Sequence, residues 1–227
     1  MSDTLWFRQV LAGPMGNCLY LVGDPETKKA FVVDPAWDPL GILRLAQEDG
    51  FEVTHVVLTH AHQDHVGGEI AGQKIPGLAE LLADVQLPIY IHEIEADQVA
   101  KVTGIPREAL TTYVDDEVLE LDGPPNVRIL HTPGHSPGSC GLLVDDHLIS
   151  GDTLFVQGVG RVDLPGSDVD AMFHSLQRLR QLPLETLVFP GHNYGPSPHS
   201  TIGQEIDLNP YLRPSSLEQW RMMMGLF

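Results

Sequence analysis

The stretch Thr59-His60-Ala61-His62-Gln63-Asp64-His65 places three imidazoles and one carboxylate within six residues. It directly follows the apolar run Val56-Val57-Leu58, which is typical of a buried strand that delivers side chains to a loop at its carboxyl end. Imidazole nitrogen and carboxylate oxygen are ligands that suit zinc, manganese or iron. His60 and His62 can face one point while Asp64 and His65 face a neighbouring one. The stretch therefore predicts two adjacent metal ions rather than a polar turn that happens to be rich in histidine.

Three later residues occur in the same setting, each near the end of an apolar run and directly after a glycine. They are His135 after Gly134, Asp152 after Gly151, and His192 after Gly191. Glycine lets the backbone turn sharply and approach a bound ion closely. Singly, each is more often a structural histidine or a turn aspartate. Together with the first cluster they give five histidines and two aspartates, enough for two sites if one carboxylate is shared.

The hydrophobic pattern predicts an α/β chain with a single domain over residues 1–227, built from two sheets with helices outside. A chain of this length can bury one large core but would be cramped as two domains. Asp38 can cap a helix over 39–48, and Gly50 can stop it. The expected strands are 5–11, 18–22, 30–33, 53–58 and 89–91, with a second sheet from 118–121, 127–131, 140–144 and 147–150. A short helix is expected at 78–83, and 93–110 is expected to be mostly helical with interruptions at Gly104 and Pro106.

Composition restricts the partners that this chain can take. The formal net charge is −18, from 31 acidic and 13 basic residues, and no Lys/Arg cluster interrupts it, so nucleic acid is not expected as a partner. Cys18 and Cys140 are expected to be buried free thiols, with a single bridge as the alternative. Residues 1–4 lack a basic region before an apolar stretch, and no run approaches bilayer-spanning length. We expect no membrane association and a cytoplasmic protein.

These residues resemble the metallo-β-lactamase fold superfamily over nearly the whole chain. The 59–65 stretch matches its His-x-His-x-Asp-His signature, and His135, Asp152 and His192 match the later ligand positions in order. The resemblance implies an αββα sandwich of two mixed sheets flanked by helices, with the metals along one edge. It also implies three roles: a first ion on His60, His62 and His135, a second ion on Asp64, His65 and His192, and a bridge from Asp152.

Two residues indicate which branches of the superfamily this chain does not resemble. Flavodiiron proteins look different at the position of His62, and many β-lactamases proper carry cysteine at the position of Asp152. Flavodiiron redox chemistry and antibiotic hydrolysis are therefore disfavoured. The segments 151–155, 158–161 and 191–194 are instead similar to hydroxyacylglutathione hydrolases and the related persulfide dioxygenases.

In the hydrolases, a basic residue at the Arg161 position and a tyrosine at the Tyr194 position contact the glutathione moiety. Two alternatives stay open, because Arg161 can form an ion pair with Asp163 and Tyr194 can simply pack against the site. Only 35 residues follow His192, fewer than the separate glutathione-binding domain of longer hydrolases needs. The segment 200–212 resembles the tail of the short, single-domain members and of the dioxygenases.

The leading hypothesis is metal-dependent hydrolysis of a thioester such as S-lactoylglutathione, by a hydroxide that bridges two divalent ions. Zinc is expected first, with iron or manganese as alternatives, and Asp64 would orient the hydroxide. A thioester fits because its thiolate leaves with little need for a general acid. The first alternative is a mononuclear iron persulfide dioxygenase that uses His60, His135 and Asp152, and the second is a non-catalytic metal-binding module. The expected partner is a small thioester or thiol-derived substrate, and a homodimer is an open expectation.

Overall fold

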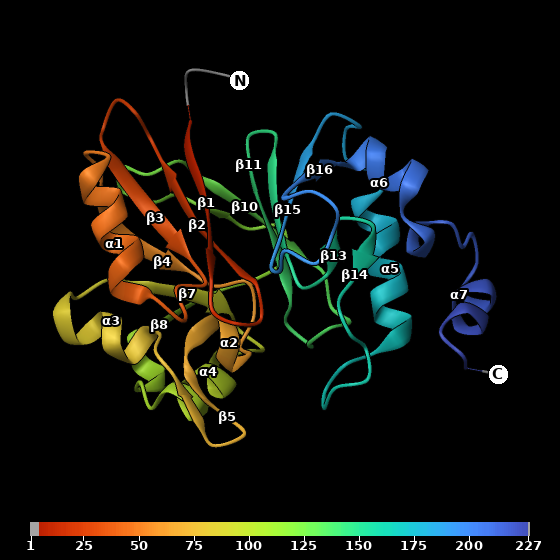
Figure 1. Cartoon of the computed structure of the whole chain (residues 1–227), viewed down its shortest axis with the longest axis horizontal. Helices are drawn as coiled ribbons and strands as arrows, with labels where there is room; N and C mark the ends of the chain where they lie inside the picture. Colours follow the sequence, from red (N-terminus) through yellow and green to blue (C-terminus); the bar gives the residue numbers. More distant parts are fainter. Residues whose placement is uncertain (1–4, 227) are drawn as a thin grey trace.

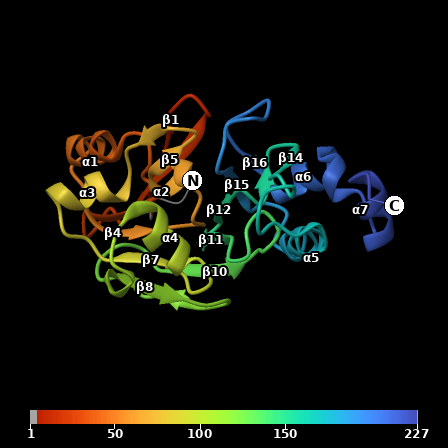
Figure 2. The same cartoon turned by 90° about the horizontal axis from the view of Figure 1, so that it is seen from below.

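Two six-stranded sheets lie against each other and carry helices on their outer faces, as Figures 1 and 2 show from two sides. The computed structural model describes residues 5–226. Residues 1–4, which the sequence analysis compared with a targeting segment, lie outside the described residues. The αββα sandwich predicted from the sequence is confirmed, and both sheets mix parallel with antiparallel pairs.

The first sheet has the strand order β1-β2-β3-β4-β7-β8. Its strands are β1 (Trp6–Ala12), β2 (Asn17–Gly23), β3 (Lys29–Val33), β4 (Glu52–Val57), β7 (Ile89–His92) and β8 (Leu110–Tyr113). The second sheet has the order β16-β15-β12-β11-β10-β9. Its strands are β9 (Val118–Leu119), β10 (Val127–His131), β11 (Cys140–Val144), β12 (His147–Gly151), β15 (Leu187–Pro190) and β16 (Ser200–Thr201). The four strands expected between 118 and 150 therefore share one sheet, as predicted.

The helices divide between the two outer faces. The first sheet carries α1 (Pro39–Glu48), α3 (Leu78–Asp84) and α4 (Ala96–Thr103), and the second carries α5 (Val169–Leu179), α6 (Ile202–Leu208) and α7 (Leu217–Met223). The remaining elements are short. One is the helical turn α2 (Gln63–Val66), and two are the 3-10 turns η1 (Arg107–Ala109) and η2 (Pro210–Leu212). Two hairpins complete the fold: β5 (Gly68–Ile70) pairs with β6 (Gln73–Ile75), and β13 (Leu154–Phe155) pairs with β14 (Gly158–Val159).

Strand β2 shows why the first sheet is covered on both sides. Cys18, Tyr20 and Val22 point into the core between the sheets, whereas Leu19 and Leu21 point into the core under the helices. Successive side chains of a strand face opposite sides, so a strand buried on both faces must be apolar throughout. Both cysteines are buried and free, as expected.

Helix α1 begins and ends close to where the sequence predicts. The Asp38 side chain accepts a hydrogen bond from the Gly41 N–H at 2.9 Å, and Pro39 occupies the first helical position, where its missing N–H costs nothing. The α5 helix, which the sequence analysis did not anticipate, is capped in the same way by Asp168 on Ala171.

The region 93–110 contains helix α4 and the 3-10 turn η1, separated at Gly104 and Pro106 as the sequence predicts. Helix α4 ends at Gly104, whose φ of 75° lies in the left-handed region that favours glycine. The chain then forms η1 and enters β8, an edge strand that runs parallel to β7. Leu110 and Tyr113 are buried there, and the β-branched and aromatic residues of 110–113 suit a strand.

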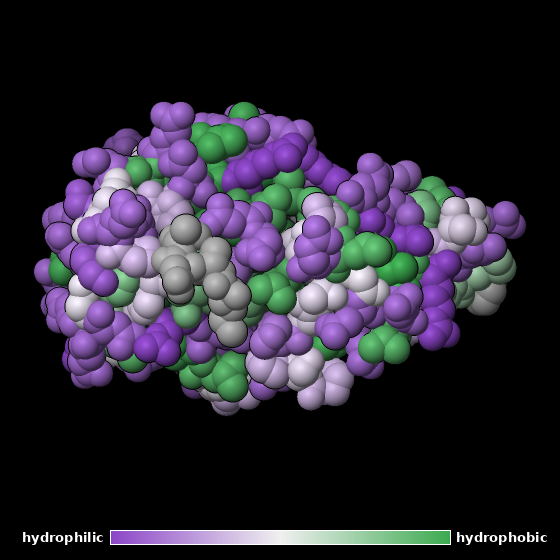
Figure 3. Space-filling model, turned by 90° about the horizontal axis from the view of Figure 1, so that it is seen from above, coloured by the Kyte–Doolittle hydropathy of each residue, from purple (hydrophilic) through white to green (hydrophobic). Residues whose placement is uncertain are grey.

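The surface agrees with the acidic composition. The face in Figure 3 is largely hydrophilic, with hydrophobic side chains in scattered patches. No helix within residues 5–226 is both long enough and apolar enough to cross a membrane.

Candidate metal centre

All seven predicted ligands lie together at one edge of the sandwich. Strand β4 leads into the loop and α2 turn that carry the first four, and the other three follow β10, β12 and β15 of the second sheet. Ligands therefore come from both sheets. His62 is half-buried and the rest are buried: His60, Asp64, His65, His135, Asp152 and His192.

The first group consists of His60, His62 and His135, whose candidate ligand atoms lie within 4.8 Å of one another. His62 Nδ1 lies 2.8 Å from His135 Nε2. His60 Nε2 is buried without a hydrogen-bond partner. A buried polar atom normally has a partner, so the unpaired His60 Nε2, lying close to ring nitrogens of His62 and His135, indicates a place suited to one cation.

The second group consists of Asp64, His65 and His192. His65 Nε2 and His192 Nε2 are 3.3 Å apart, and Asp64 Oδ2 lies 3.5 Å and 3.3 Å from these two atoms. Asp152 stands between the groups. Its Oδ2 is 3.4 Å from His135 Nε2 and 3.3 Å from His192 Nε2, while its Oδ1 has no hydrogen-bond partner.

Hydrogen bonds from the ring nitrogens to backbone carbonyls determine which nitrogen of each histidine is available to a metal. His135 Nδ1 lies 2.9 Å from the Arg161 carbonyl, and His192 Nδ1 lies 3.0 Å from the Met15 carbonyl. A carbonyl only accepts, so each Nδ1 carries the hydrogen and each Nε2 is the nitrogen available to a metal. His62 is the exception, since it turns Nδ1 toward His135.

Asp34 is a part of this site that the sequence analysis missed. Its Oδ1 accepts a hydrogen bond from the Thr59 N–H at 2.9 Å, and its Oδ2 accepts one from the Thr59 hydroxyl at 2.6 Å. Oδ2 also lies 3.0 Å from His65 Nδ1, which leaves His65 Nε2 for the ion. Although Asp34 also groups with His60 and His65, these contacts occupy its oxygens. The sequence feature that could have indicated a role for Asp34 is its position directly after the apolar strand β3.

Asn17 is the second residue that was missed. Its Nδ2 donates to Asp64 Oδ2 at 3.0 Å and to the Asp64 carbonyl at 3.1 Å. Asn17 is buried at the start of β2 and bridges to His192 through the backbone. It therefore fixes the Asp64 side chain relative to the second sheet.

In the metal-free protein, the pKa values of the histidines are shifted in opposite directions in the two groups. Burial, together with the neighbouring His135 and His65, lowers the pKa of His62 to about 4. Burial also lowers the pKa of His60, and His65 adds to that shift. The rings of His60 and His62 are consequently neutral at pH 7 and can accept a cation without losing a proton.

The second group has the opposite protonation. Burial of His192 favours the neutral ring, but Asp152 and Asp64 outweigh it and raise the pKa to about 9. Likewise, burial opposes the charge on His65, but Asp64 and Asp152 hold its pKa well above the usual value. Burial would also protonate Asp152, yet His65 and His192 keep the pKa of its carboxyl well below the usual range. Protons thus occupy the positions that a second cation would take.

This donor set is suited to divalent metal ions. Neutral nitrogens, carboxylates and two partnerless buried atoms converge without any cysteine, a combination that suits zinc, iron or manganese. His60, His62 and His135 would hold one ion, Asp64, His65 and His192 the other, and Asp152 could reach both. The identity and number of the ions remain predictions.

The substrate-contact candidates Arg161 and Tyr194 lie beside this centre. Both line a small hollow of about 120 Å³ over the ligands, and Arg161 also lines an adjoining cleft of about 500 Å³. The Tyr194 ring stacks on His192 with 4.7 Å between centroids and is 60% exposed. The Arg161 guanidinium forms two hydrogen bonds with Asp163, at 2.8 and 2.9 Å. The ion pair that the sequence analysis left open is therefore present.

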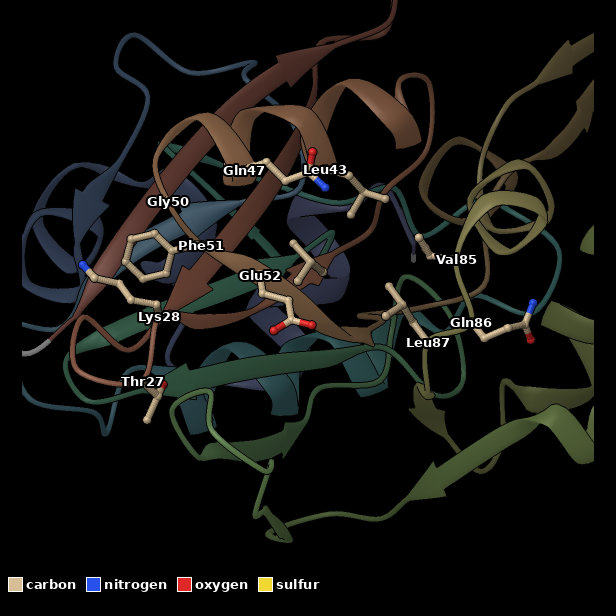
Figure 4. Close-up of a pocket in the computed structure, with 11 residues that line it drawn as sticks. Thr27, Lys28, Leu43, Gln47, Gly50, Phe51, Glu52, Val85, Gln86 and Leu87 are labelled. Carbon is tan, nitrogen blue, oxygen red and sulfur yellow. The ribbon is translucent and has the colours of Figure 1, made fainter.

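A larger cleft of about 600 Å³ lies elsewhere, between α1, the start of β4 and the segment before β7 (Figure 4). Lys28 Nζ sits 4.8 Å from the centre of the Phe51 ring in this cleft. It is at the amino ends of β3 and β4, and none of the seven ligands lines it. Binding residues of parallel strands gather at the carboxyl ends, where the histidines are.

Comparisons with known proteins agree with this arrangement. A profile described as the Metallo-beta-lactamase superfamily matches residues 12–192. The chain is 33% identical over 225 residues to a "probable metallo-hydrolase", YqgX of Bacillus subtilis, covering 93% of this chain and 99% of that protein. It is 32% identical over 211 residues to hydroxyacylglutathione hydrolase GloC of Haemophilus influenzae, covering 88% and 94%. The crystal structure of ETHE1 from Myxococcus xanthus superposes with a TM-score of 0.80 at 28% identity, covering 97% and 90%.

Proposed function

The chain belongs to the metallo-beta-lactamase superfamily, and from that premise we propose that it is a metal-dependent hydrolase of thioesters, with S-lactoylglutathione as the representative substrate. One observation carries the proposal: seven buried or half-buried ligands from both sheets converge as two groups that share Asp152. The relatives described as a metallo-hydrolase and a hydroxyacylglutathione hydrolase support the reaction class.

Bound divalent ions would lower the pKa of a water molecule and polarise the substrate carbonyl. The chain's own residues would hold and orient the reactants. Asp64 accepts a hydrogen bond from Asn17, which orients its carboxylate so that it can accept a hydrogen bond from the attacking water. Tyr194 and Arg161 would border the thiol arm at the open side of the site. The departing thiolate needs little help from a general acid.

The test is thioester hydrolysis by protein loaded with zinc, iron or manganese. Two metal ions per chain by elemental analysis, with hydrolysis well above the metal-only background, are expected. The absence of thioesterase activity in protein that holds two ions would refute the proposal.

A second candidate is a mononuclear iron persulfide dioxygenase, which the structural similarity to ETHE1 favours. His60, His135 and Asp152 would then suffice to hold one iron, because open positions are needed for oxygen and substrate. Oxygen uptake with glutathione persulfide and one iron per chain would select this candidate over the hydrolase.

A further inference from the structure

The cleft beside the metal centre has apolar walls. Met15, Ile70, Leu164 and Pro165 line it, and they come from three segments: the loop before β2, the β5–β6 hairpin and the loop after Arg161. Phe155 extends the apolar surface toward the ligands, with its ring centroid 5.6 Å from that of Tyr194. A substrate arm that lies in this cleft can bury apolar surface on both sides.

The same cleft has little positive charge. Among its described lining residues, Arg161 is the only lysine or arginine, and Glu69 adds a carboxylate to the wall. The arm of a glutathione thioester carries two carboxylates and one ammonium group. Apart from the metal ions of the proposed centre, it would meet a single guanidinium in a protein of net charge −18, which repels anions as they approach.

That guanidinium already has a partner. Arg161 Nε and Nη2 each donate to one oxygen of Asp163, so both oxygens of the carboxylate are engaged in a bidentate pair. The Arg161 and Asp163 side chains are 68% and 69% exposed, so the pair is held at the surface rather than locked in the core. Asp163 occupies the Nε–Nη2 edge of Arg161, so a substrate carboxylate must displace it to form a bidentate pair at that edge. At Nη1 the carboxylate would meet a guanidinium whose charge Asp163 already offsets.

We propose that the thioester cleaved at this site has a thiol arm without carboxylates, and that Asp163 determines this preference by neutralising Arg161. The inference rests on the proposed hydrolase function. It narrows the substrate class of the same cleft from thioesters in general to acyl thioesters of uncharged thiols, and makes S-lactoylglutathione, the representative thioester named above, a poorer substrate than these.

The test compares two thioesters that share one acyl group, S-lactoyl-N-acetylcysteamine and S-lactoylglutathione, on the metal-loaded protein. The wild type should have the higher kcat/KM for the N-acetylcysteamine thioester. Asp163→Asn should reduce the ratio of the two kcat/KM values about fivefold in favour of glutathione, the upper end of what an exposed ion pair contributes. Adding Arg161→Gln to Asp163→Asn should remove that gain.

A matched control is available in the Arg221–Asp170 pair, another exposed bidentate pair, which lies outside the cleft. Asp170→Asn should leave the substrate ratio unchanged. A readout independent of turnover is calorimetric binding of S-methylglutathione, which should tighten about fivefold in Asp163→Asn and not in Asp170→Asn.

The outcomes separate the two proposals. Hydrolysis of both thioesters with equal or higher kcat/KM for S-lactoylglutathione would overturn the inference and keep the hydrolase. An unchanged ratio in Asp163→Asn would overturn the role of Asp163. Hydrolysis of neither thioester by protein holding two ions would refute the hydrolase itself.

Discussion

Replacing Asp152 with alanine should weaken the binding of both ions at once. One carboxylate oxygen lies 3.4 Å from His135 Nε2 of the first group and 3.3 Å from His192 Nε2 of the second. No other predicted ligand contacts both groups through its oxygens. Asp152→Ala should therefore remove a ligand from each ion, whereas His192→Ala should affect chiefly the second.

The size of the effect follows from this geometry. A partner outside the coordination sphere is typically worth about 10- to 100-fold in metal affinity, so a direct ligand should be worth at least about 100-fold per ion. At ~1.4 kcal/mol per tenfold, that is ~3 kcal/mol for each ion. Hydrolysis should be abolished in both variants, while His192→Ala should retain about one ion and, if the protein is a mononuclear dioxygenase, much of its oxygen uptake.

Elemental analysis after gel filtration of the two variants measures this directly, with hydrolysis and oxygen uptake assayed on the same samples. Asp207→Ala, which removes an exposed carboxylate from α6, is the control and should keep the wild-type metal content. If Asp152→Ala retains both ions as tightly as wild type, the bridging role of Asp152 is wrong.

Four other outcomes are expected. Because His192 has a pKa near 9 in the metal-free protein, binding of the second ion should release protons, and its affinity should rise with pH up to about 9; calorimetry in buffers of different ionisation enthalpy would show this. For the same group, the free energy of unfolding of the metal-free protein should fall between about pH 6.5 and 9, since the raised pKa stabilises only the protonated ring; urea titrations that show no fall would contradict the sign. Asp34→Asn should weaken the second ion about 10- to 100-fold by releasing His65, and unaltered binding in a competition assay with a chelator would exclude this role. Trp220→Ala should lower the free energy of unfolding by ~3 to 5 kcal/mol because Trp220 is fully buried under α5, while leaving the metal content intact.

The candidate ligands could be found in the sequence because most of them follow a local rule. An apolar strand ends, the chain turns, and a histidine or aspartate comes next, as at His60 and Asp152. Such a signal needs only neighbouring residues, and the carboxyl ends of strands bring the separate signals to one edge.

Asp34 and Asn17 could not be predicted in the same way. Their roles depend on contacts with residues far along the chain, Thr59 and His65 for Asp34, and Asp64 for Asn17. Those contacts exist because β2, β3 and β4 are adjacent in one sheet with a fixed register, which sequence periodicity alone does not define. Strand β8 was missed for a related reason, since its pairing with β7 overrides the helical pattern that precedes it.

Because the candidate ligands follow strands of both sheets, bound metal ions would also restrict the conformations of the unfolded chain. A bound ion would connect segments as distant as His60 and His135, or His65 and His192, and so would close long loops in the backbone. Closing such loops restricts the unfolded chain in the way that a disulfide does. Cys18 and Cys140 form no such link in the described chain. The metals would therefore serve as removable cross-links between the two halves of the sandwich, formed and broken by metal supply rather than by redox conditions.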